Sequence, residues 1–232
     1  MGVYFESVND DAAIQIDDTF ANFAYVQSVA VQPVASTDQS AQAGTGRWSF
    51  SVQGIDPLLA VSAPDGVALD QRTQSGSVFN FSGLCETTGS ITFYVFDRPV
   101  MGGSGQYLEI RNAANEVVFD ASARYMRVMG QISSTGGAGS ISVPAGRTYG
   151  ALLGLSGQAI TVAGGYVGGG PYWLVQVINE RPFVRVSGGV ASYGRFRSHS
   201  WAQDGPSGVP TPNPGQYGSP SLITPVVDIT GY

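Results

Sequence analysis

A single histidine, His199, and a single cysteine, Cys85, limit the acid–base and nucleophilic chemistry of this chain. His199 lies between two serines in RSHSW, but a catalytic triad needs convergence in space and an orienting acid, which adjacency in sequence does not provide. The segment LCET around Cys85 has no basic neighbour that would favour a reactive thiolate. One His and one Cys give no zinc-ligand spacing. We therefore expect no catalytic residue, no metal site and no cofactor, in a protein that is not an enzyme.

Aromatic residues are the other chemical resource of the chain. Tyr166, Tyr172 and Trp173 gather in the glycine-rich segment GGYVGGGPYW. On an exposed loop these rings can stack on a sugar, because they combine apolar area with a polar group. In a strand the same residues would belong to a hydrophobic core. Both interpretations stay open from the sequence, and the first makes the three residues candidate contacts with a host receptor or glycan.

The chain carries one short pattern twice, as YFESVNDDAAIQID in residues 4–17 and as YLEIRNAANEVVFD in residues 107–120. The two copies align without a gap and share four identities: Tyr4/Tyr107, Glu6/Glu109, Asn9/Asn112 and Asp17/Asp120. In each copy apolar residues alternate on both sides of a small polar turn, which is typical of a β-hairpin. We predict superposable hairpins in residues 4–27 and 107–130.

A weaker similarity follows each copy, because YVFDRPV (residues 94–100) and VINERPF (residues 177–183) share an apolar strand, an acid and Arg-Pro. Together the two similarities predict tandem β units, in residues 1–103 and 104–204. A repeated hairpin favours a scaffold, since chemistry usually needs one asymmetric site whereas repeats serve spacing or oligomer contacts.

Four aspartates lie close together near the start of the chain: Asp10, Asp11, Asp17 and Asp18. Carboxylate oxygens of this kind are the ligands that calcium prefers. The second copy has Ala113 and Ala114 at the positions of the first two, yet it keeps the hairpin pattern. We therefore expect no calcium site, and we interpret Asp17 and Asp120 as strand-end acceptors for backbone N–H groups.

Composition excludes several classes of protein. Only 12% of residues are charged and 43% are hydrophobic, which is too apolar for a disordered chain. The net charge of −6 and the lack of a basic run oppose nucleic-acid binding. The longest apolar stretches, ALLGL and YWLVQVI, are too short to span a membrane, and MGVYFESV lacks the pattern of a secretory signal. We expect that the protein is made in the cytoplasm and does not insert into a membrane.

Short apolar segments alternate with glycine-rich turns along most of the chain. RWSFSV has Trp48, Phe50 and Val52 on one face, and SITFYVF is apolar on both faces, as an interior strand would be. YWLVQVIN and FVRVSG read as two strands separated by a turn at NERP. These features favour an all-β fold of tandem β-sandwich-like units built from short antiparallel strands.

The composition changes at residue 205. Residues 205–232, GPSGVPTPNPGQYGSPSLITPVVDITGY, contain six prolines and little charge, which predicts an extended Pro/Gly-rich arm. The apolar residues near its end suggest that this arm docks on a neighbouring subunit. The expected docking residues are Leu222, Ile223, Val226, Val227 and Tyr232.

Residues 93–128, FYVFDRPVMGGSGQYLEIRNAANEVVFDASARYMRV, resemble a group of uncharacterised tail-module proteins of long-tailed bacteriophages. Members of that group carry an apolar strand, a Phe-Asp-x-Pro-like turn, and then a strand-Asn-turn-strand unit that ends in Val-Phe-Asp. The segment YFESVNDDAAIQIDDTFANFAYV looks like the opening of the same family. The resemblance covers about a quarter of the chain and brings no catalytic residue with it.

The resemblance implies a non-enzymatic structural component of the virion, at the tail tip, baseplate or fibres, that is assembled in the host cytoplasm. It also implies other tail proteins as partners, a homo-oligomeric state and a part in host attachment. The alternative is a receptor-binding or carbohydrate-binding tail protein. A distal, exposed position of the GGYVGGGPYW segment would favour that alternative, and a buried one would favour the scaffold.

Overall fold

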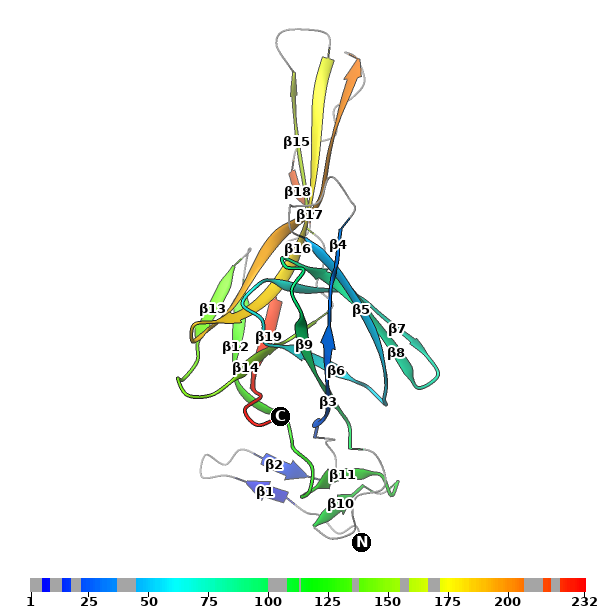
Figure 1. Cartoon of the computed structure of the whole chain (residues 1–232), viewed down its shortest axis with the longest axis vertical. Helices are drawn as coiled ribbons and strands as arrows, with labels where there is room; N and C mark the ends of the chain where they lie inside the picture. The colour runs from blue at the N-terminus through cyan, green and yellow to red at the C-terminus, as the bar shows by residue number, and fades with distance from the viewer. Residues whose placement is uncertain are drawn as a thin grey trace.

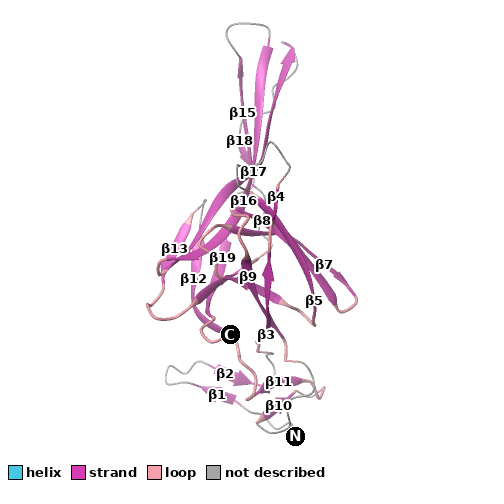
Figure 2. Ribbon diagram, viewed as in Figure 1, coloured by secondary structure: helices cyan, strands magenta, loops and turns pink. Residues whose placement is uncertain are grey.

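A computed structural model describes the backbone of residues 6–8, 14–17, 22–36, 45–99, 108–112, 114–134, 138–154, 159–166, 172–206, 215–217 and 222–232. The regular elements in these residues are β-strands, and no helix occurs among them (Figure 2). Most strands belong to two sheets that pack face to face around a shared core (Figure 1). The predicted all-β, sandwich-like class is confirmed.

The first sheet has six strands in the order β12-β19-β14-β6-β9-β3, all antiparallel. Its strands are β3 (Ala24–Val31), β6 (Leu58–Val61), β9 (Ile91–Asp97), β12 (Arg127–Ser134), β14 (Tyr149–Leu152) and β19 (Leu222–Asp228). The segment SITFYVF forms β9, which lies inside the sheet and is mostly buried, as its apolar residues on both faces predict.

The second sheet has nine strands, seven of them in the order β13-β17-β16-β7-β8-β5-β4. Those seven are β4 (Val34–Ala35), β5 (Gly46–Gln53), β7 (Val67–Ser75), β8 (Val78–Cys85), β13 (Gly139–Ser142), β16 (Tyr172–Ser187) and β17 (Val190–Pro206). The remaining two, β15 (Ala159–Tyr166) and β18 (Gly215–Tyr217), extend the sheet beside the outer part of β16. In β5, Trp48 and Val52 are buried and Phe50 is partly buried, as predicted.

The two repeated segments form two separate hairpins. They are β1 (Glu6–Val8) with β2 (Ile14–Asp17), and β10 (Glu109–Arg111) with β11 (Val117–Asp120). The outermost pair is Glu6 with Asp17 in one and Glu109 with Asp120 in the other, and both hairpins shift register after their second pair. The two copies therefore have the same strand pairing, which confirms hairpins within residues 6–17 and 109–120. The predicted ranges 4–27 and 107–130 are too long, since residues 24–27 and 127–130 pair in the six-stranded sheet.

The duplication continues beyond the hairpins into the six-stranded sheet. Ala24 pairs with Asp97 at the start of β3, and Arg127 pairs with Asp228 at the start of β12. Two residues further on, a register shift interrupts both pairings, with Val26 of β3 and Met129 of β12 as the skipped residues. The unit β3-β9-β6 thus corresponds strand for strand to β12-β19-β14.

The two units meet at an antiparallel pair, in which Ala60 of β6 lies opposite Leu152 of β14. From one edge inward the strands are β12, β19 and β14, and from the other edge inward they are their counterparts β3, β9 and β6. The two halves are therefore related by an approximate two-fold axis near this pair. The other sheet repeats the arrangement, since β16 and β7 are antiparallel neighbours at its centre. The tandem units are therefore interleaved, because each sheet takes strands from both.

The weaker sequence similarity was assigned to the wrong segment. YVFDRPV runs through the end of β9, whose counterpart in the second half is β19, ending in VVD. VINERPF instead lies within β16 of the other sheet. Strand pairing identifies the counterpart because it compares long-range neighbours, whereas short apolar segments followed by an acid resemble one another by chance.

The predicted turn at NERP is also wrong, since β16 runs through it without a break. Its pairing with β15 ends at Glu180, and its pairing with β7 is at Val184. Pro182 lies between these two ladders, and a register shift with β17 falls just before Glu180. A proline is tolerated there because it lies outside both ladders, where its missing N–H breaks no pairing on that side.

The core between the sheets is rich in aromatic residues. The ring centroid of Phe93 lies 4.5 Å from that of Trp48 and 5.0 Å from that of Phe50. The Trp48 indole N–H donates to the Leu84 carbonyl at 3.2 Å, so the polar atom of this buried ring is satisfied. A second cluster around Ile132 and Tyr149 continues the core through the other half.

Residues 222–232 are part of the sandwich, and this corrects the expectation of a docking arm. Val226 and Val227 are fully buried in β19, between β12 and β14 of the same chain. Tyr232 stacks on Tyr25, with ring centroids 4.9 Å apart, and its hydroxyl donates to the Tyr125 carbonyl at 2.5 Å. Ile223 is 65% exposed, and the side chain of Leu222 lies outside the described residues.

Composition misled here because proline was expected to exclude an interior strand. Pro225 lies in β19, but β19 pairs with β14 only at Val226, Val227 and Asp228. The proline therefore sits just beyond that ladder, and its missing N–H costs no hydrogen bond to β14.

Candidate functional site

The most prominent surface feature is a blade that projects from the sandwich at the end opposite to the hairpins (Figure 1). We define the blade as β15, β18 and the outer parts of β16 (172–180) and β17 (199–206). Its strands pair in the order β18-β15-β16-β17. In the first half of the chain, five residues, 62–66, connect β6 directly to β7. In the second half, the corresponding connection runs from β14 to the inner part of β16, and it contains β15 and the outer part of β16. The blade therefore belongs to the second half alone.

The predicted aromatic contacts lie at the tip of this blade. Tyr166 ends β15, while Tyr172 and Trp173 begin β16, so these three residues are distal to the sandwich (Figure 1). Tyr166 pairs with Trp173, and paired residues share one face of a sheet. Tyr172 falls on the opposite face. The structure thus brings two of the three residues together.

Sequence analysis did not identify the buried acids that end β9 and β19 as a matched pair. Asp97 accepts hydrogen bonds from the backbone N–H groups of Ile55 at 2.7 Å, Asp56 at 2.8 Å and Arg98 at 2.7 Å. This carboxylate fastens the loop before β6 to the end of β9. The shared ending of VFD and VVD was the available sequence signal.

Asp228, the counterpart of Asp97, binds one backbone N–H group and two arginine side chains. Its carboxylate accepts from the Thr230 N–H at 2.9 Å and from the Arg147 guanidinium at 2.6 Å, and Arg127 lies 3.4 Å away. Burial of the carboxyl opposes its ionisation, but the hydrogen bonds from Thr230 and Arg147 and the charge of Arg127 outweigh it and lower the pKa of Asp228 to about 2. The acid is therefore a charged anchor for the loop before β14.

Asp120 has the structural role predicted for it. Its Oδ1 accepts from the Ser122 hydroxyl at 2.6 Å and from the Ser122 N–H at 2.8 Å, and these bonds lower the pKa of Asp120. Within the same hairpin, Asn112 Oδ1 accepts from the N–H groups of Ala114 and Glu116, at 3.0 and 2.9 Å. The side chains of the N-terminal aspartates lie outside the described residues.

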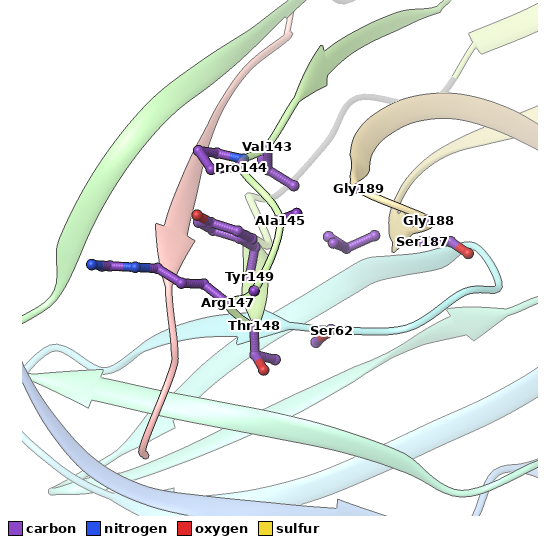
Figure 3. A pocket seen from close by; sticks show the side chains of 12 residues that line it. Ser62, Val143, Pro144, Ala145, Arg147, Thr148, Tyr149, Ser187, Gly188 and Gly189 are labelled. Atoms are coloured by element: carbon purple, nitrogen blue, oxygen red, sulfur yellow. The ribbon is translucent and has the colours of Figure 1, made fainter.

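A pocket of about 390 Å³ lies between the loop 143–149 and the tight turn 187–189 (Figure 3). Ser62, Thr148 and Ser187 contribute hydroxyl groups to its lining. The Arg147 guanidinium extends away from Gly188 and Gly189 in Figure 3 and reaches Asp228. Among the lining residues no carboxylate or imidazole is present, so the pocket offers hydrogen bonds rather than acid–base chemistry.

Of the two residues with catalytic potential, the structure describes the side chain of Cys85 only. Cys85 is fully buried, and this burial raises the pKa of its thiol, which disfavours a thiolate nucleophile. His199 lies in β17 opposite Asn179 of β16, and its side chain is outside the described residues. Among the described residues no group of three or more His, Cys, Asp or Glu side chains is placed to hold a metal ion.

Apolar residues are also exposed along the β12 edge of the six-stranded sheet. Val128, Met129 and Ile223 are 55%, 45% and 65% exposed. On the matching edge, Tyr25 corresponds to Val128 and is covered by the Tyr232 ring. The two edges are thus covered differently although their strand pairing is the same.

Comparison with protein-family models, with curated proteins and with solved structures found no match for this chain. No helix long and apolar enough to cross a membrane occurs in the described part of the chain.

Proposed function

We propose that the protein is a non-enzymatic structural component of a bacteriophage tail, at the tip, baseplate or fibres, that acts in virion assembly and host attachment. The observation that carries the proposal is that the two ends of the molecule differ in structure. The two hairpins lie at one end, the duplicated sandwich lies in the middle, and a blade present only in the second half forms the other end (Figure 1). This arrangement suits a subunit that is held at one end and projects at the other.

The chemistry of the described acids supports a structural role. Asp97 and Asp120 bind backbone N–H groups of their own chain, and Asp228 holds two arginines. The sequence resemblance to tail-module proteins of long-tailed phages points to the same role. Other tail proteins are the partners that this function requires, and the exposed apolar residues of the β12 edge are suitable contacts for them.

Association with virions is the direct test. In gradient-purified particles from a lysate of a host that carries this gene, peptides of the chain should co-purify with intact tails at a fixed ratio to a known tail protein. Detection only in the soluble fraction, with infectious tailed particles lacking the chain, would contradict the proposal.

The second candidate, a receptor-binding or carbohydrate-binding tail protein, is favoured by the distal position of Tyr166 and Trp173 on one face of the blade tip. Replacing Trp173 with Ala should weaken adsorption of particles to host cells by about 5- to 150-fold, if a sugar stacked on this ring contributes the roughly 1 to 3 kcal/mol that a stacked nucleic-acid base does. Adsorption-rate measurements on variant and parent particles would show this. Tyr172→Ala, on the opposite face, is the matched control, and an equal loss in both variants would argue against a specific contact.

A further inference from the structure

We infer that the blade is an oligomerisation element, and that one of its faces is covered by the blade of a second copy of this chain. The first step is strand register. Val162 of β15, Val177 of β16 and Trp201 of β17 lie side by side in one row, and Tyr166 and Trp173 lie in another row on the same face. Val175 occupies a row between them. These six residues define the apolar face of the blade, so a second copy that covers it excludes Tyr166 and Trp173 from the receptor contact considered above.

The second step compares the two faces. On the apolar face, the same register also places Asn179, His199 and Gln203, but no Asp, Glu, Lys or Arg among the described residues. The opposite face has the charged residues Glu180 and Asp204 and the polar residues Thr161 and Gln176, beside the apolar residues Tyr172, Leu174 and Ile178. The charged residues of the described blade therefore fall on one face, and the other face carries most of its large apolar residues.

The third step is the lack of a second layer. In the sandwich, the six-stranded sheet covers β16 and β17, but the blade extends beyond that sheet and the described strands form a single layer there (Figures 1 and 2). An isolated antiparallel sheet needs an apolar face packed against another layer to be stable in water.

A second copy is the occupant that fits this face. An identical face has no Asp, Glu, Lys or Arg among the described residues, so two of them can stack without burying a carboxylate, guanidinium or ammonium group. Three aromatic residues can bury about 150 to 250 Å² each, and with the three valines this approaches the roughly 800 Å² per partner of a stable interface. The chain carries a net charge of −6, so stacking of a neutral face also avoids concentrating that charge at the interface.

The test is the mass of the purified full-length protein in solution. Light scattering after size-exclusion chromatography should give at least twice the chain mass of 24.2 kDa, with dissociation on dilution. Val177→Asp should raise the dissociation constant by about thirtyfold or more, the effect of losing one central interface residue, while the far-UV CD spectrum stays that of a β protein. Val175→Asp, on the same face, should have the same effect.

Gln176→Asp, one residue away on the opposite face, is the matched control and should remain oligomeric. A parent protein that is monomeric up to about 100 µM, or a control that dissociates as readily as Val177→Asp, would overturn the inference. Because the measurement uses purified protein, its outcome is independent of whether the chain is found in virions.

Discussion

A chain that stops after residue 221 should fail to fold. The truncation removes β19, which pairs with β12 on one side and β14 on the other, and so divides the six-stranded sheet. Val226 and Val227 are fully buried and Ile229 is 2% exposed. Loss of these three side chains removes roughly 5 to 9 kcal/mol of burial, which is comparable with the total stability of a typical domain.

Soluble yield, far-UV CD and a thermal melt would measure this effect. Ile223→Ser is the control in the same strand, because that side chain is 65% exposed and its replacement should change stability by less than about 0.5 kcal/mol. A truncated protein that melts cooperatively at the parent temperature would contradict the assignment of β19 to the sandwich and would support a dispensable arm.

Replacing Asp228 with Asn should destabilise the protein by about 2 kcal/mol at neutral pH. The substitution leaves Arg147 and Arg127 without their carboxylate while the site itself stays buried. Breaking a fully buried pair costs roughly 3 to 5 kcal/mol, but both arginine side chains are about half exposed, so solvent screening reduces the expected loss. Urea unfolding at pH 7 measures it.

The same variant should change the response to acid. The pKa of Asp228 is lowered from 3.8 to about 2 in the folded protein, so its contribution to stability is present above about pH 4 and is lost as the pH falls toward 2. The difference in unfolding free energy between the parent and Asp228→Asn should therefore shrink over that range. A difference that stays constant from pH 7 to pH 2 would show that the ion pairs do not stabilise the fold.

Glu116→Gln provides the reference for these measurements, because Glu116 is exposed and its oxygen accepts a hydrogen bond from Asn112 that glutamine can keep. Its unfolding free energy should lie within about 0.5 kcal/mol of the parent at pH 7.

Local sequence alone determined the strand class and the repeated hairpins. Alternation of apolar residues has a period of two, so it reports which residues of β5 face the core without knowledge of their partners. The aligned hairpins share their strand pairing because a hairpin closes over a short turn, and everything that sets its register lies within one segment.

Only the tertiary structure decided which strands become neighbours. The counterpart of β9 is β19, which the sequence presented as part of a proline-rich arm, and the two units share both sheets. Pairing of distant strands depends on the faces that all of them bury together. The sequence of a short segment such as LITPVVD therefore does not specify which strands it pairs with. The blade and the matching of Asp97 with Asp228 were not predicted for the same reason, since both depend on strand neighbours that only the fold brings together.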